Sequence, residues 1–304
     1  MIRTLPKNAN TIKKRKANIQ CSGVRFFLST VSAMFIMQKK FLEKIYKKYN
    51  RRKYVSPDPL EFLYNYKKDQ DIEIIGLVAA SLAYGRVAQI LKSVNSILEK
   101  LSPLPKEFLV KEKKLNLLFK GFRHRFTTGK DISSLLEGVK KAVIKHGSLQ
   151  NCFLNGYSEN DGTIIPALSN FVKEVKGRGK DAYLLPSPEK GSACKRLNLY
   201  LRWMVRKDNV DPGGWKKVPK SKLIVPLDTH LFNIAGIFGF SNRKQANLKS
   251  ALEITNAFKQ FCPRDPVKYD FALTRFGIRN DMGIEDIVKD CSDGVMNSNT
   301  PRVR

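Results

Sequence analysis

The chain has 304 residues and a formal net charge of +29, far more positive charge than solubility requires. Such an excess indicates a polyanionic partner, although a lysine-rich composition by itself would account for part of it. A hydrophobic content of 42% is enough for a sizeable core and excludes a wholly disordered chain. The five cysteines are widely spaced and form no C-x-x-C pair, which argues against a disulfide framework, a zinc knuckle or a four-cysteine iron–sulfur cluster.

About half of this charge lies near the N-terminus, where residues 1–53 carry 15 lysines and arginines against one acid, Glu43. We expect residues 1–36 to form a basic extension outside the fold. Three explanations remain open: translation starts at Met34 or Met37, the segment is a signal or transit peptide, or it is a nucleic-acid-binding arm. Its apolar stretch is too short to span a bilayer, so no membrane partner is expected.

From residue 37 onward, apolar residues recur at helical spacing, which predicts an all-α fold. A turn is expected at residues 56–59. Residues 71–83 are apolar on nearly all sides and predict a central buried helix. Further helices are predicted at residues 87–98, 131–146 with Gly147 as C-cap, 161–175, 191–206, 229–239, 243–260 and 265–276.

The predicted helices form one domain over residues 37–282, followed by a loose tail at 283–304. No segment alternates with the period of a β-strand, and no glycine-rich phosphate loop is present. No internal repeat is found either.

The most informative segment is residues 225–232, in which an apolar run ends on Asp228 and a helical pattern begins at once. At a helix start, a carboxylate accepts hydrogen bonds from free backbone N–H groups and keeps its negative charge. Asp228 is therefore well placed to stabilise a developing cation, or it is an N-cap only.

A second informative segment is the turn at residues 185–196, which precedes another helix and carries Lys190 and Lys195. A positioned lysine together with a positioned aspartate, in a very basic chain, suggests chemistry on a nucleic acid. Either lysine could be the reactive one. The plain alternative for Lys190 is a solvent-exposed turn residue, and for Lys195 it is packing beside a phosphate or a carboxylate.

A lysine-bearing Leu-Pro turn before an Asp-Thr-His helix start resembles the helix-hairpin-helix DNA glycosylase superfamily, most closely its archaeal 8-oxoguanine branch. The matching positions are Leu185-Pro186, Lys190 and Pro226 to His230. Over roughly residues 37–280 the chain also resembles a bacterial family of conserved proteins with a domain of unknown function. The glycosylase hairpin has Gly-x-Gly, whose N–H groups approach a DNA phosphate, whereas this chain has Ser187-Pro188-Glu189.

The glycosylase resemblance implies a two-lobed helical repair protein that extrudes a damaged or modified base from duplex DNA. Asp228 would stabilise the sugar cation formed as the base leaves. Lys190 or Lys195 would attack the sugar carbon and form a Schiff base that permits strand cleavage. No metal or other cofactor is implied. A monomer in the cytoplasm, associated with the nucleoid, is expected.

Four candidate nucleic-acid contacts lie along one predicted helix: Arg196, Arg202, Arg206 and Trp203. The arginines could bind phosphates while the ring stacks on a base. Internal pairing with aspartates is the alternative, because arginines in an apolar helix are often buried and paired.

Other candidate contacts are Tyr84, Arg86 and His230. Tyr84 and Arg86 follow the buried helix where the glycosylases carry the residue that fills the gap left by a flipped base. A core tyrosine and a structural histidine are the alternatives. Residues 121–126 interleave cations with rings, which suits distorted nucleic acid or simple packing.

These observations favour a DNA glycosylase and AP-lyase-like protein of base-excision repair. The second hypothesis is a non-catalytic DNA- or RNA-binding protein on the same helical scaffold. The third is a helical protein whose charge is compositional and whose partner is another protein.

Overall fold

The computed structural model describes residues 34–176 and 183–279. The predicted tail at 283–304 and most of the predicted extension at 1–36 lie outside these described residues. The chain divides into two units, residues 1–44 with 285–304 and residues 45–284. Residues 34–44 of the first unit are helical, and residues 45–49 of the second are helical as well.

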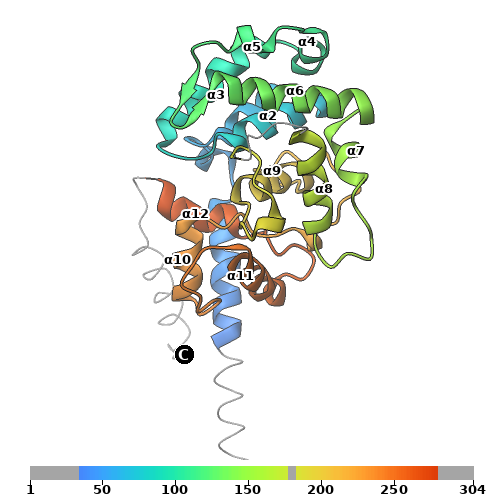
Figure 1. The fold of residues 1–304 in the computed structure, drawn as a ribbon. Helices are drawn as coiled ribbons and strands as arrows, with labels where there is room; N and C mark the ends of the chain where they lie inside the picture. Colours follow the sequence, from blue (N-terminus) through green and yellow to red (C-terminus); the bar gives the residue numbers. More distant parts are fainter. Residues whose placement is uncertain (1–33, 177–182, 280–304) are drawn as a thin grey trace, which may run out of the picture. The chain divides into compact units, whose positions relative to one another are not determined.

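The prediction of an all-α fold is confirmed: in the described part of the chain, helices are interrupted by a single two-stranded hairpin (Figure 1). The α-helices of the second unit are α2 (Asp69–Ser81), α3 (Val87–Leu101), α4 (Pro105–Lys111), α5 (Leu115–Leu118), α6 (Gly129–His146), α7 (Leu149–Leu154), α8 (Ile165–Lys176), α9 (Lys195–Val205), α10 (Thr229–Ile237), α11 (Leu248–Phe261) and α12 (Asp270–Ile278). Its 3₁₀-helices are η1 (Arg52–Tyr54), η2 (Pro59–Asn65), η3 (Pro188–Lys190) and η4 (Lys220–Lys222). The strands are β1 (Arg123–His124) and β2 (Thr127–Thr128).

Helix α2 is the central buried helix that the sequence predicted, and it packs against α9, η2, α4 and α7. Two buried acids on α2 cap neighbouring helices. Asp71 accepts a hydrogen bond from the N–H of Lys106 at 2.9 Å, and Glu73 accepts one from the N–H of Leu149 at 2.8 Å. Each carboxylate satisfies orphan donors at a helix start. Burial raises the pKa of Glu73 to about 7.

Helix α6 begins two residues earlier than predicted and ends at the predicted C-cap, Gly147, which adopts a left-handed conformation with φ 82°. The start is fixed by a capping box between Thr128 and Asp131. Gly138 lets α8 approach closely, because a Cβ there would lie 1.7 Å from the carbonyl oxygen of Val175.

The hairpin of β1 and β2 was not predicted, because strands of two residues are too short to show an alternating pattern. His124 on β1 pairs with Thr127 on β2, leaving Arg125 and Phe126 as a two-residue turn. Several predicted helices are also shorter in the structure. Helix α9 starts at Lys195 rather than 191, and α11 starts at Leu248 rather than 243.

Candidate active site

Asp228 is the N-cap of α10, as predicted. Its backbone is extended, and Oδ1 accepts a hydrogen bond from the N–H of Leu231 at 2.8 Å. The buried run before it is held against α11, because the N–H of Val225 donates to Thr255 Oγ1 at 3.1 Å. The cap occupies one carboxylate oxygen and leaves Oδ2 for another partner.

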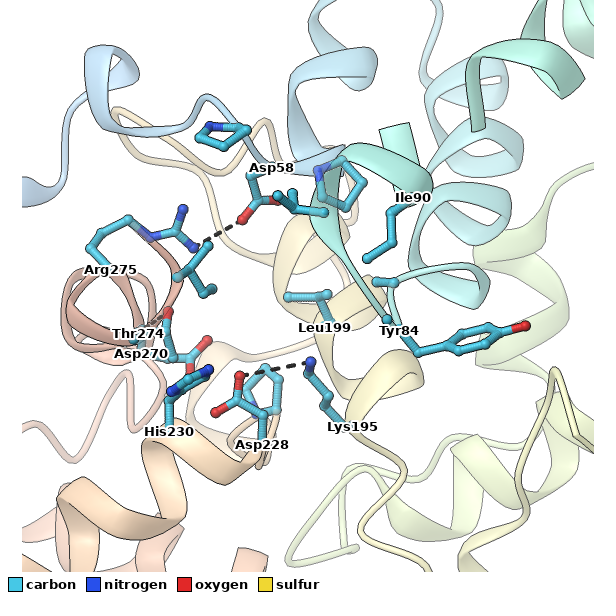
Figure 2. A pocket seen from close by; sticks show the side chains of 18 of the residues that line it. Asp58, Tyr84, Ile90, Lys195, Leu199, Asp228, His230, Asp270, Thr274 and Arg275 are labelled. Atoms are coloured by element: carbon cyan, nitrogen blue, oxygen red, sulfur yellow. Dashed lines mark hydrogen bonds and ion pairs between the residues drawn. The ribbon is translucent and has the colours of Figure 1, made fainter. Parts of the chain in front are cut away.

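That partner is Lys195, the first residue of α9. Its Nζ lies 3.7 Å from Asp228 Oδ2, and Figure 2 shows the two groups pointing at each other. The lysine side chain is 38% exposed and the aspartate side chain 12%. The amine is therefore reachable from outside while the carboxylate is largely enclosed by protein.

The pair lies in the wall of a cavity of about 280 Å³, just below the usual range of about 300–1,000 Å³ for small-molecule sites. Segments far apart in sequence build this wall: the start of η2, the loop between α2 and α3, and helices α9, α10 and α12. Val87, Ile90 and Leu199 supply an apolar part. A ring-shaped or short apolar group with polar edges would suit such a lining.

The remaining wall is polar and charged. Arg275 on α12 donates from Nη2 to Asp58 Oδ2 at 2.9 Å, and Asp270 accepts a hydrogen bond from Arg202 (Figure 2 shows the first of these pairs). Two atoms in this wall, Asp270 Oδ1 and Arg275 Nη1, are buried and have no hydrogen-bond partner among the residues that the structure describes. Burying such groups unpaired costs free energy.

Asp270 also interacts electrostatically with the pair. Its pKa is raised to about 6, first by burial, and further by the negative charge of Asp228, while Arg202 acts in the opposite direction. Two carboxylates, a lysine and an arginine thus influence one another around a single cavity.

His230 lines the same cavity, and its ring lies against α12 at Gly277. A Cβ at Gly277 would fall 2.1 Å from His230 Nδ1, so this close contact requires glycine. The described residues contain no group of three or more His, Cys, Asp or Glu side chains able to hold a metal ion.

A second, more open hollow of about 640 Å³ adjoins the cavity. Lys195 and Asp228 line both, as do Tyr84 and Gly85, while Tyr183 and Arg196 line only the second. We call this second hollow the groove. It provides an approach to the lysine from outside.

The geometry distinguishes the two candidate lysines. Lys190 is exposed on η3 and lines neither the cavity nor the groove, whereas Lys195 faces Asp228. The separation follows from α9 starting at Lys195, which points its side chain back past the helix N-terminus toward α10. Of these two lysines, only Lys195 lies close to Asp228.

The prediction that Arg202, Arg206 and Trp203 contact nucleic acid is wrong. All three are buried. Arg202 pairs with Asp211 and Asp270, and Arg206 pairs with Asp208, Asp211 and Asp265. The internal-pairing alternative is confirmed, because an arginine in an apolar helix needs carboxylates to offset its desolvation.

Of the four other candidates, His230 lines the cavity as described above, and the remaining three have mixed positions. Arg196 lines the groove and donates to the backbone oxygens of Ser81 and Tyr183. Tyr84 directs its ring away from the Lys195–Asp228 pair (Figure 2) and its hydroxyl is hydrogen-bonded to the β1–β2 hairpin. Arg86 is exposed at the start of α3.

Sequence reasoning missed the cavity residues Asp58, Asp270 and Arg275. The sequence could have predicted Asp58 as a helix N-cap, because it precedes Pro59, and in the structure it does cap η2. No pattern within α12 links Asp270 and Arg275 to a site 40 residues and more upstream, because their role depends on how α12 packs beside α10.

No helix in the described residues is both long and apolar enough to cross a membrane. Comparison with curated proteins found no match, and comparison with solved structures found none. A family model with the description "Protein of unknown function (DUF2400)" matches residues 58–279, which include Lys195, Asp228 and nearly all of the cavity wall. The chain therefore belongs to the DUF2400 family.

Proposed function

We propose that this protein is a DNA glycosylase and AP-lyase-like repair protein, with Lys195 as the nucleophile and Asp228 as the assisting carboxylate. The observation that supports the proposal is the approach of Lys195 Nζ to within 3.7 Å of Asp228 Oδ2 in the wall of a cavity that opens to the surface. An amine can form a covalent intermediate at a sugar carbon, and a fixed carboxylate stabilises positive charge that develops there.

In the proposed reaction a nucleotide leaves the duplex and its base enters the cavity. Lys195 Nζ, as the neutral amine after giving a proton to water, bonds to the sugar C1′ while the bond from C1′ to the base breaks, and the base takes the electron pair and a proton from water. Asp228 stabilises the positive charge on the sugar during this exchange. Ring opening then gives a Schiff base, from which the strand can be cleaved by elimination.

The test is borohydride trapping of the full chain on duplexes that contain 8-oxoguanine, uracil, thymine glycol or an abasic site. We expect a covalent protein–DNA adduct that disappears in Lys195→Ala and falls strongly in Asp228→Asn. Lys190→Ala is the matched control, since Lys190 is an exposed lysine nearby in sequence, and it should trap like the unmodified protein. An adduct that depends on Lys190, or no adduct on any duplex, would refute the proposal.

A non-catalytic nucleic-acid-binding role is the second candidate. It is favoured over catalysis because the turn before α9 departs from the glycosylase hairpin, with Glu189 there pairing with Lys173 at 2.7 Å, while the chain keeps its large positive charge. With a net charge of +29, this role predicts gel-shift binding that weakens steeply as salt rises, without any borohydride adduct.

A further inference from the structure

The tip of the β1–β2 hairpin carries an aromatic side chain that is largely exposed to solvent. Phe126 is 71% exposed, which is the largest exposure among the large hydrophobic side chains that the structure describes. The preceding Arg125 has φ 51°, a left-handed conformation that residues other than glycine rarely adopt. An exposed ring on a strained turn contributes nothing to the core, and such strain is often found at functional sites.

The base of this hairpin is firmly attached. His124 is fully buried, with Nε2 3.1 Å from the carbonyl oxygen of Tyr84 and Nδ1 2.9 Å from Ser93 Oγ. A carbonyl oxygen only accepts, so Nε2 carries the proton and Nδ1 accepts from the serine. Tyr84 in turn contacts the hairpin through its hydroxyl, 3.0 Å from the carbonyl oxygen of His124 and 2.7 Å from Thr127 Oγ1. The tip is thus held out from a rigid base.

The tip lies at the edge of the groove that leads to Lys195. The Arg125 side chain packs over Gly85, where a Cβ would come within 2.8 Å of it, and Gly85 lines both the cavity and the groove. The Phe126 ring meets Tyr183 edge-on with centroids 6.4 Å apart, and Tyr183 meets Tyr84 at 5.5 Å. The row of rings therefore runs from the hairpin tip to the cavity mouth.

Positive charge accompanies these rings. The Arg196 guanidinium lies 5.1 Å from the centroid of Tyr84 and 4.9 Å from that of Tyr183, and the Arg125 guanidinium lies 5.5 Å from the centroid of Phe126. Flat rings that alternate with guanidinium groups bind stacked bases and their phosphates. The groove and the hairpin tip beside it thus carry the aromatic rings and positive charges that nucleic acids bind.

We propose that Phe126 inserts into the base stack of duplex DNA at the position vacated by the nucleotide that enters the cavity. This inference rests on the proposed function. A ring wedged between base steps compensates for part of the stacking lost when a nucleotide is extruded. Phe126, rather than Tyr84, is the wedge, because the Tyr84 hydroxyl is engaged in holding the hairpin.

The test uses the full chain and a duplex with an abasic site, placing the fluorescent base 2-aminopurine next to it. Phe126→Ala is compared with Ile144→Ala, which removes a similarly exposed apolar side chain on α6, outside the cavity and the groove. We expect Phe126→Ala to lose the fluorescence change on binding and to lower the duplex trapping rate roughly tenfold or more, within the range of one base–ring stack. Ile144→Ala should leave both unchanged, and Phe126→Trp should restore both.

The outcomes separate the two proposals. If Lys195-dependent adducts form but Phe126→Ala matches Ile144→Ala, the wedge is refuted and the proposed chemistry stands. If no adduct forms but Phe126→Ala alone loses the fluorescence change, the chemistry fails and the wedge stands. No binding to duplex DNA would refute the wedge. The wedge would also be refuted if Phe126→Ala lowered trapping on single-stranded DNA as much as on the duplex, since the ring would then act by stacking on single strands.

Discussion

At the scale of residues, Asp228 combines two tasks that use different oxygens. Oδ1 accepts from the N–H of Leu231 and stabilises the start of α10, while Oδ2 faces Lys195. A carboxylate fixed by a helix start needs no further reorganisation to interact with a nearby cation. The structural and chemical roles can therefore be separated by substitution.

Asp228→Asn should keep the cap and lose the charge. Asparagine and aspartate are about equally good N-caps, so we expect the free energy of unfolding to change by less than about 0.5 kcal/mol while trapping falls strongly. Asp228→Ala should lose both, at a cost of about 1 kcal/mol. Urea denaturation and borohydride trapping, both measured on the two variants, check these expectations. A large loss of stability in Asp228→Asn would show that the charge itself holds the fold.

At the scale of elements, the cavity depends on how closely α10 and α12 pack. His230 on α10 lies against Gly277 on α12, and the polar wall comes from Asp270 and Arg275 on α12. A side chain at residue 277 would push the two helices apart or turn the histidine away.

Gly277→Ala is therefore expected to destabilise the fold by about 1–3 kcal/mol and to disturb the cavity. Gly236→Ala on α10 is the matched control, because a Cβ there meets nothing within 4 Å. Replacing an unhindered helical glycine by alanine stabilises a helix by up to about 1 kcal/mol. Thermal denaturation should shift the two variants in opposite directions, and a shift in the same direction would contradict the close contact between His230 and Gly277.

At the scale of the whole second unit, buried charges connect α9 to its surroundings. Arg202 and Arg206 pair with Asp211, Asp265 and Asp270, so the helix that begins with Lys195 is tied to α12 and to the loops before it. A buried ion pair adds little net stability, but breaking it leaves an uncompensated charge. The network thus fixes where Lys195 lies.

Asp211→Asn should be strongly destabilising, by about 3 kcal/mol or more, because two buried guanidinium groups lose their shared carboxylate. Glu253→Gln removes the carboxylate of an exposed pair with Arg243 and should cost less than about 1 kcal/mol. Urea unfolding of both variants measures the difference. Equal losses in the free energy of unfolding would mean that the buried ion pairs contribute no more to stability than the exposed pair.

Local sequence patterns were sufficient to predict the helical class, the buried helix α2, the caps at Gly147 and Asp228, and the two segments that hold the candidate site. These features depend on local periodicity and capping chemistry, which neighbouring residues encode. Helix packing was needed to establish that Lys195 rather than Lys190 meets Asp228, that Arg202 and Arg206 are buried, and that Phe126 projects beside the groove. Each of these depends on which helices pack together and where a helix begins. Contacts across dozens of residues leave no local pattern.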